Sequence, residues 1–256
     1  MRILVFGVCR CESPAELRAL QHWAAALERV APDADHLIVD TKVPAVDPAS
    51  LPGLARFEPP LRIAGEIAPV AIGRRSVLAF LDDIGTLERR GRDGWGRAFC
   101  QGLLCAVANR YDLVVHIEGG LLTRLDIPYH GRTMQERGIN ALGAVTPNKG
   151  WLETGLMFFD VAYVERIRLI DRYRWDEPGS QLRPQVKVSE ILGDELYLRP
   201  WRGVRDNIAL LRFLVRDLHW LKSQVALECD AFLREGPWPV RRFGDPVSEV
   251  LVESGG

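Results

Sequence analysis

Residues 111–122 read Tyr-Asp-Leu-Val-Val-His-Ile-Glu-Gly-Gly-Leu-Leu and predict a buried β-strand that ends in an acid and two glycines. The run at 113–117 is rich in β-branched residues, which is typical of a parallel strand covered on both faces. Glu118 follows where the strand leaves the sheet, and ligands of open α/β sheets bind at the carboxyl ends of strands. Gly119 and Gly120 let a ligand or the backbone approach closely. A second interpretation stays open, in which Glu118 caps the next element and the glycines form a turn.

The length and composition are those of an ordinary globular chain. The 256 residues are 47% hydrophobic and 26% charged, which allows a sizeable core. A formal net charge of −1 argues against electrostatic binding of nucleic acid by the chain as a whole, although the 33 basic residues can still line a local cleft. The apolar run at the N-terminus is too short for a signal peptide, and no segment approaches the roughly 20 apolar residues that cross a bilayer. We therefore expect a cytoplasmic protein with no nucleic-acid partner and no transmembrane segment.

The first forty residues predict a strand–helix–strand unit. Residues 3–8 and 36–40 form short apolar strands, and the helix between them begins at Ser13, with Glu16 completing a capping box. Such a unit has a right-handed crossover and a parallel sheet. Asp40 ends the second strand, where it either binds the base or ribose of a nucleotide or caps the following turn.

The five cysteines are odd in number and lack zinc-ribbon spacing, which favours reduced thiols. Cys9 and Cys11 stand one residue apart after the first strand. That pair is compatible with metal binding or redox cycling, but no second pair of ligands follows it.

A glycine-rich turn at residues 92–99 opens a helix that runs to about residue 109. Such a helix start suits a phosphate or another anion, and Arg97 either contacts that anion or is an ordinary first-turn residue. The turn has neither the GxGxxG order of a dinucleotide site nor the lysine of a P-loop. Elsewhere we expect helices at 76–90, 161–173, 208–221 and 226–233, a strand at 153–160, a helix or turn at 189–197, and a polar active-site loop at 123–149.

Four short patterns occur in a suggestive order along the chain. Glu118-Gly119-Gly120 follows the central strand, Thr154-Gly155-Leu156-Met157-Phe158-Phe159 enters a second strand, Asp194-Glu195 forms an acid pair, and His219 comes late. This order resembles a GT-A-type glycosyltransferase over roughly residues 3–222. The first pattern lies at the position of the family's Asp-x-Asp motif, and the second resembles the strand that lines its sugar and acceptor site.

The resemblance implies an α/β fold, a Rossmann-like α/β/α sandwich with a mostly parallel central sheet. It implies one catalytic domain over 1–235, with a nucleotide-binding half at about 1–122, an acceptor-side half at about 123–235 and a C-terminal tail at 236–256. The implied activity is transfer of a sugar from a nucleotide-sugar donor to a glycan, polysaccharide or small-molecule acceptor. The implied site residues are, for the donor, Asp40, Arg97, Glu118, Gly119, Gly120 and Arg202; for the acceptor and sugar, Trp151, Glu153, Thr154 and Gly155; and for catalysis, Glu195 or Asp194 as general base.

The chain departs from the Asp-x-Asp motif, because Glu118 replaces the first acid and Gly120 the second. Three interpretations follow. Glu118 holds a divalent cation, Mn²⁺ or Mg²⁺, alone or with His219. Alternatively, arginines such as Arg97 or Arg202 offset the leaving-group charge without metal. In the third, catalysis has been lost.

Each implied residue also has a structural interpretation. Asp194 and Glu195 suit a helix cap, and His219 suits packing inside an apolar helix.

Two other functions compete with glycosyl transfer. An inactive sugar- or nucleotide-binding protein is compatible with Gly120. A sugar-nucleotide nucleotidyltransferase is disfavoured, because residues 6–10 lack the long glycine-rich loop that binds a triphosphate.

Overall fold

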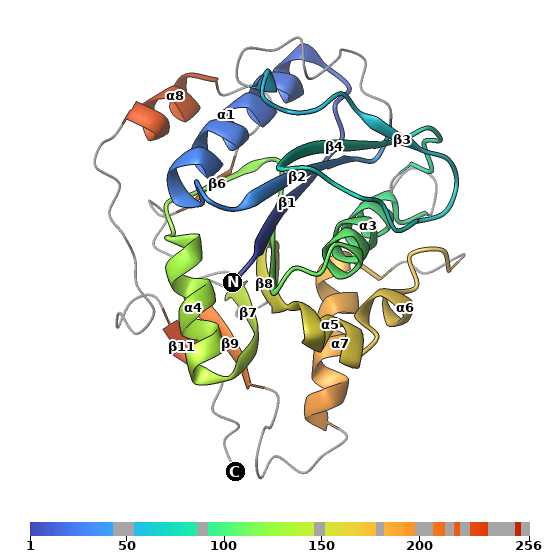
Figure 1. The fold of residues 1–256 in the computed structure, drawn as a ribbon, viewed down its shortest axis with the longest axis vertical. Coiled ribbons are helices and arrows are strands. Elements are labelled where there is room, and N and C mark those ends of the chain that lie inside the picture. Colours follow the sequence, from blue (N-terminus) through green and yellow to red (C-terminus); the bar gives the residue numbers. More distant parts are fainter. Residues whose placement is uncertain are drawn as a thin grey trace.

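A nine-stranded sheet runs through the middle of the computed structural model, in the order β11-β9-β7-β8-β5-β1-β2-β4-β3 (Figure 1). The structure describes residues 1–42, 54–85, 92–145, 152–177, 182–197, 207–212, 218–220, 226–234 and 249–251. The strands of this sheet are β1 (Ile3–Cys9), β2 (Asp35–Asp40), β3 (Leu61–Ile63), β4 (Arg75–Phe80), β5 (Leu113–Ile117), β7 (Ile139–Val145), β8 (Leu152–Asp160), β9 (Asn207–Arg212) and β11 (Glu249–Leu251). Within the described residues, seven of the nine run in one direction, and β8 and β11 run opposite to them.

Helices cover both faces of the sheet and bury two separate apolar clusters (Figure 1). One face is covered by α1 (Pro14–Val30), α4 (Ile127–Arg137) and α8 (Ala226–Arg234). The other face is covered by α3 (Gly94–Ala108), α5 (Val161–Arg166), α6 (Leu169–Tyr173) and α7 (Pro184–Tyr197). The predicted α/β/α sandwich with a mostly parallel sheet is therefore confirmed.

The first strand–helix–strand unit forms as the sequence predicts. β1 and β2 pair in parallel, with Cys9 opposite Asp40 at their carboxyl ends. The Ser13 hydroxyl accepts a hydrogen bond from the Glu16 amide at 3.3 Å, and the Glu16 carboxylate accepts one from the Glu12 amide at 2.8 Å. The first bond satisfies an amide in the first turn of α1 that has no intrahelical partner, and the second ties the residue before the N-cap to the helix.

Several predictions of secondary structure are wrong, and one physical reason explains them. Residues 76–90 were expected to be helical but begin in strand β4, and the expected loop at 123–149 contains α4 and the whole of β7. The expected helix at 208–221 instead contributes to two strands, β9 and β10 (Leu218–Trp220), so His219 is on a strand. Short apolar runs do not distinguish helix from strand by periodicity, and pairing with distant strands decides between them.

Two further differences concern helix and strand ends. The expected helix at 161–173 is interrupted, because Arg168 adopts a left-handed φ of 53° between α5 and α6. Residues 249–251, in the segment expected as a tail, pair with β9 as the edge strand β11. A small second sheet forms where β10 pairs antiparallel with β6 (Leu121–Thr123).

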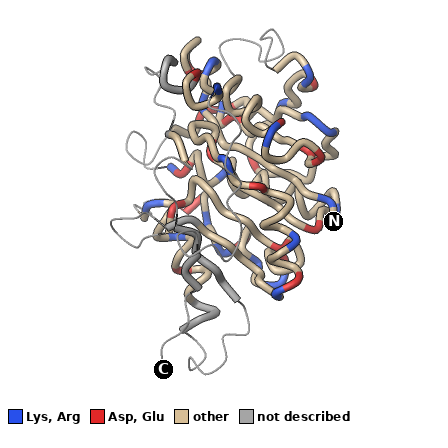
Figure 2. The backbone as a smooth tube through the Cα atoms, turned by 90° about the vertical axis from the view of Figure 1, so that its left-hand side faces the viewer, with Lys and Arg blue, Asp and Glu red and all other residues tan. Residues whose placement is uncertain are grey.

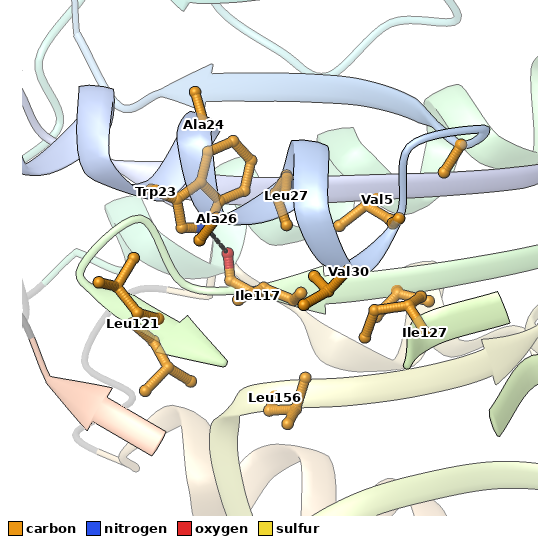
Figure 3. Close-up of a cluster of buried hydrophobic side chains, with 14 of the residues drawn as sticks. Val5, Trp23, Ala24, Ala26, Leu27, Val30, Ile117, Leu121, Ile127 and Leu156 are labelled. Atoms are coloured by element: carbon orange, nitrogen blue, oxygen red, sulfur yellow. Dashed lines mark hydrogen bonds between the residues drawn. The ribbon is translucent and has the colours of Figure 1, made fainter. Parts of the chain in front are cut away.

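Trp23 ties α1 to the end of the central strand. Its side chain is fully buried, and its indole Nε1 donates a hydrogen bond to the Ile117 carbonyl oxygen at 3.1 Å (Figure 3). A Cβ added at Gly7 would lie 2.6 Å from the Trp23 ring, so a glycine there lets the indole lie against β1. The contact sets the position of Ile117, the residue directly before Glu118.

We expect Trp23→Phe to lower the free energy of unfolding by about 1–3 kcal/mol, because the buried Ile117 carbonyl loses its donor and the smaller ring leaves a gap. Urea unfolding followed by circular dichroism measures the change. Arg18→Ala, at an exposed position on the same helix, is the control and should change stability by less than about 0.5 kcal/mol. An equal loss in both variants would contradict the role assigned to the indole.

Candidate functional site

The carboxyl ends of four parallel strands meet at one edge of the sheet. β1, β2, β4 and β5 are neighbours in the order β5-β1-β2-β4 and end at Cys9, Asp40, Phe80 and Ile117. Because β8 is antiparallel to β5, with Ile117 opposite Leu156, its beginning lies at this same edge. The topology therefore brings Glu118, a predicted donor residue, beside residues 153–155, which the sequence assigned to the acceptor side.

The turn after β5 holds Glu118 by backbone hydrogen bonds. The Glu118 amide donates to the Gly155 carbonyl at 2.9 Å, and the Leu121 amide donates to the Glu118 carbonyl at 2.8 Å. The Gly119 amide donates to the Val8 carbonyl at 3.0 Å, and a Cβ on Gly119 would lie 3.0 Å from the Cys9 Cβ. The turn expected from the two glycines is thus present, and it leaves the Glu118 carboxylate uncommitted to capping.

The Glu118 carboxylate is unusual in its electrostatics. Burial, with a smaller contribution from the Glu153 carboxylate, raises the pKa of Glu118 from 4.5 to about 7. Among the described residues, no basic side chain forms an ion pair with either acid, and Glu153 accepts a hydrogen bond from the Gly155 amide at 3.2 Å. A buried carboxylate near a second acid, with no basic partner among the described residues, is suited to hold a proton or to bind a cation.

His116, near the end of β5, hydrogen-bonds to the backbone of residues 153–155 at the start of β8. Its ring Nδ1 lies 2.7 Å from the Thr154 carbonyl oxygen, and burial lowers the pKa of His116 to about 3. The imidazole is therefore neutral, with its proton on Nδ1, which donates to that carbonyl. The rings of Phe6, Trp95 and Phe99 surround it at centroid distances of 4.9, 5.4 and 5.3 Å.

Asp40 lies at the end of β2 at the same edge. Its side chain is 1% exposed and accepts hydrogen bonds from the backbone amides of Lys42 and Cys11, at 3.2 and 3.4 Å. Burial raises the pKa of Asp40 from 3.8 to about 6. The capping interaction that the sequence left open is therefore present.

Arg97 is buried in the first turn of α3 and is held by protein groups. One guanidinium nitrogen donates to the Asp82 carboxylate at 2.9 Å and to the Gly65 carbonyl at 3.1 Å, and the other donates to the Asp82 carbonyl at 2.6 Å. The guanidinium also lies 3.9 Å from the centre of the Phe80 ring. These contacts fit the structural interpretation of Arg97 and connect the end of β4 to α3.

The remaining predicted residues are distributed more widely. Asp194 and Glu195 lie near the end of α7, a helix that packs against β8, and their side chains are not described. Trp151 and Arg202 lie outside the described residues. His219 pairs with Leu122 across the small sheet, and its ring stacks on Phe232 at 5.4 Å.

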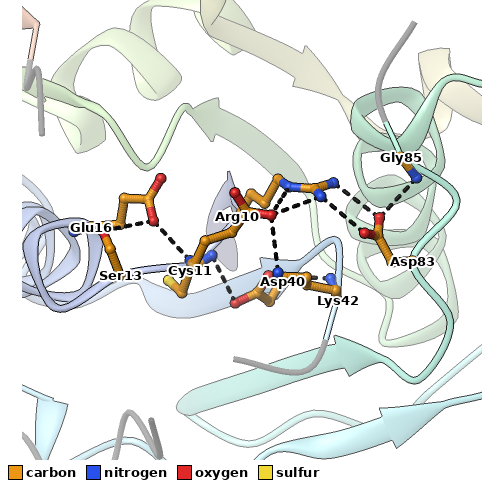
Figure 4. A network of polar contacts seen from close by, with 9 residues as sticks. Arg10, Cys11, Ser13, Glu16, Asp40, Lys42, Asp83 and Gly85 are labelled. Atoms are coloured by element: carbon orange, nitrogen blue, oxygen red, sulfur yellow. Dashed lines mark hydrogen bonds and ion pairs between the residues drawn. The ribbon is translucent and has the colours of Figure 1, made fainter. Parts of the chain in front are cut away.

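Arg10 is a site residue that the sequence analysis missed. Its guanidinium forms two hydrogen bonds to the Asp83 carboxylate, each 2.9 Å, and one to Glu12 at 2.8 Å (Figure 4). The Lys42 ammonium donates to the same Glu12 carboxylate at 2.9 Å. The network spans the ends of β1, β2 and β4. The sequence feature that could have predicted it is a basic residue, Arg10, directly after the first strand.

Comparison with known proteins identifies the fold. No protein-family model and no curated protein matches the chain. A candidate glucose-1-phosphate thymidylyltransferase from Bacillus anthracis has 14% identity and a TM-score of 0.52, over 96% of this chain and 98% of that one. The 4-diphosphocytidyl-2C-methyl-D-erythritol synthase of Anaerococcus prevotii has 10% identity and a TM-score of 0.52, over 91% and 98%. The chain thus shares the Rossmann-like α/β fold of these two solved structures.

The distribution of charge and the hydropathy of the helices bear on the partners of the protein. On the side shown in Figure 2, basic and acidic residues are interspersed along the described chain rather than gathered by sign. Among the described helices, none combines the length and apolar character needed to cross a membrane.

We expect Glu118→Gln to stabilise the ligand-free protein at pH 8. Because the native state binds this proton more tightly than the unfolded state, Glu118 progressively destabilises the fold as the pH rises from about 4.5 to about 7. The glutamine removes that penalty, by up to about 2 kcal/mol after allowance for partial solvent exposure, and has little effect at pH 4. Thermal unfolding at pH 4 and pH 8 measures the difference. Glu165→Gln, at an exposed position on α5, should leave the pH dependence unchanged.

Proposed function

We propose that this protein is a glycosyltransferase that moves a sugar from a nucleotide-sugar donor to a glycan or small-molecule acceptor. The observation that carries the proposal is the Glu118 carboxylate, half-buried beside Glu153 where β5 ends, in a fold shared with nucleotide-diphospho-sugar transferases. One catalytic domain would contain the whole nine-stranded sheet, including β11, with donor binding in the half up to about residue 122.

The leaving diphosphate requires a group that offsets its charge. Glu118 and Glu153 fit a divalent cation, because their oxygens are the ligands that Mg²⁺ and Mn²⁺ prefer and no basic side chain among the described residues forms an ion pair with them. Glu153 would supply the second carboxylate that Gly120 lacks. Bound there, the cation would stabilise negative charge on the departing phosphate oxygens.

The chain's own residues would perform the remaining steps. Gly119 and Gly120 would contact the nucleotide, and Arg202 would add positive charge near the phosphates. Asp40 is not part of this proposal, because its side chain is buried and accepts hydrogen bonds from backbone amides. Trp151, Thr154 and Gly155 would line the sugar and acceptor pocket. Glu195, or Asp194 beside it, would accept the proton of the acceptor hydroxyl as it attacks the anomeric carbon. His219 is not part of this proposal, because its ring packs against Phe232.

A second candidate is a sugar-nucleotide nucleotidyltransferase, which the named Bacillus anthracis neighbour favours at the level of fold. Four residues, Arg10 to Ser13, separate β1 from α1, which leaves little loop to wrap a triphosphate. The third candidate is a binding protein without turnover. Incubation with a nucleoside triphosphate and a sugar 1-phosphate tests the second candidate, and donor binding without hydrolysis or transfer indicates the third.

The first experiment is a thermal-shift screen of nucleoside diphosphates and their sugars, each with and without Mn²⁺ or Mg²⁺. We expect one nucleotide to stabilise the protein by about 2.7 kcal/mol at a hundredfold excess over Kd. Glu118→Ala should abolish the shift, whereas Glu165→Ala should retain it. No shift with any nucleotide under any of these metal conditions would overturn the proposal.

Gly120→Asp tests the assignment of the divergent motif. An added carboxylate should tighten Mn²⁺ binding by about tenfold, or about 1.4 kcal/mol, because ligand charge raises the affinity of such sites. Isothermal titration with Mn²⁺ in the presence of the selected nucleotide measures the gain. Gly138→Asp, at a helix end outside the site, is the control for added charge. Equal Mn²⁺ affinity in all three proteins would contradict a cation site at this turn.

A further inference from the structure

Cys9, Cys11 and Asp40 bring three potential metal ligands together at the edge of the sheet. The two sulfurs and a carboxylate oxygen all lie within 4.8 Å of one another. Cys9 and Asp40 are paired residues at the ends of β1 and β2, and Cys11 follows before α1 begins. The three side chains are therefore positioned by the parallel sheet and by the start of a capped helix.

The spacing of the two sulfurs matches a tetrahedral metal centre. The Cys9 and Cys11 Sγ atoms are 3.8 Å apart. Two thiolates on one zinc ion, each about 2.3 Å from it at a tetrahedral angle, are also about 3.8 Å apart. A single cation can thus bind both sulfurs with little movement of either side chain.

Among the described residues, no basic side chain forms an ion pair with the buried Asp40 carboxylate, although the charge of Lys42 favours its ionised form. Asp40 and Cys11 are each 1% exposed, and the hydrogen bonds that Asp40 accepts from nitrogen come from backbone amides. Within the described part of the chain, the nearby basic side chains are committed elsewhere, Arg10 to Asp83 and Glu12, and Lys42 to Glu12 (Figure 4). A buried acid beside two thiols is an environment that a cation stabilises.

We propose that Cys9, Cys11 and Asp40 bind a thiophilic divalent cation of the Zn²⁺ class. Sulfur ligands select such ions over Mg²⁺ or Ca²⁺, which prefer oxygen. Three protein ligands leave a fourth tetrahedral position for water or for an oxygen of a bound molecule. Cys9 is partly exposed and gives the ion access, whereas Cys11 and Asp40 lie deeper.

This site is separate from the carboxylate pair proposed for the donor, although the two are neighbours. Cys9 contacts the turn through Gly119, whereas Glu118 and Glu153 belong to the β5–β8 side. When the ion binds, the two thiols become thiolates and release their protons to solvent, while the carboxylate binds through one oxygen. The site depends on its own three residues and not on the activity of the protein.

The test is titration of the reduced full-length protein with Co²⁺, which has strong thiolate-to-metal absorption when bound by cysteine. We expect one equivalent to give this absorption and Zn²⁺ to remove it. Cys9→Ser and Cys11→Ser should each weaken binding at least about tenfold, or about 1.4 kcal/mol, and Asp40→Asn should weaken it as well. Cys105→Ser, at a buried thiol in α3, should bind as the parent does.

Glu118→Ala should also keep the Co²⁺ absorption, so failure of the donor proposal does not affect this test. If the cysteine variants do not fold, X-ray absorption of the zinc-loaded parent still decides, because two sulfurs at about 2.3 Å are expected. Absence of thiolate absorption with several equivalents of Co²⁺, an unchanged spectrum in the folded Cys9→Ser and Cys11→Ser variants, or a zinc shell without sulfur would overturn the proposal.

Discussion

Parallel pairing of β1 with both β2 and β5 is the constraint on which the site depends. It places Cys9, Asp40 and Ile117 at one edge, so residues from three separate parts of the chain become neighbours. The Trp23 indole then fixes the last carbonyl of β5, and the Gly119 amide bonds back to β1. The turn that carries Glu118 is thus anchored from both sides before any ligand is present.

At this edge of the sheet, some acids are paired with basic side chains and others are not. On the β2–β4 side, the acids Glu12, Asp82 and Asp83 are paired with basic side chains. On the β5–β8 side, the charge of Glu153 adds to the burial that raises the pKa of Glu118, and at the end of β2 Asp40 accepts hydrogen bonds from backbone amides. A folded protein retains such unfavourable carboxyl groups only if packing elsewhere stabilises them, and these positions are where ligand binding has the most to gain.

The parts of the structure that the sequence predicted are those with local signals. The capping box at Ser13 and Glu16, the central strand and the acid at its end all depend on residues close together in the chain. The strands β4, β7 and β9 were not predicted, because each acquires its conformation by pairing with strands far away in sequence. For the site, the sequence placed Glu118 at a strand end, but its position beside residues 153–155 follows from the pairing of β5 with β8, and Arg10 was missed because its partner Asp83 is 73 residues distant.

The reversed direction of β8 has a consequence for how such a protein can diversify. Because β8 enters the site with its first residues, Glu153 and Thr154 belong to a different chain segment from the ends of β1, β2 and β5. Side-chain changes at 153 and 154 therefore alter one wall of this edge, but the backbone there has to stay in place, because the Gly155 carbonyl holds the Glu118 amide and the Thr154 carbonyl holds His116.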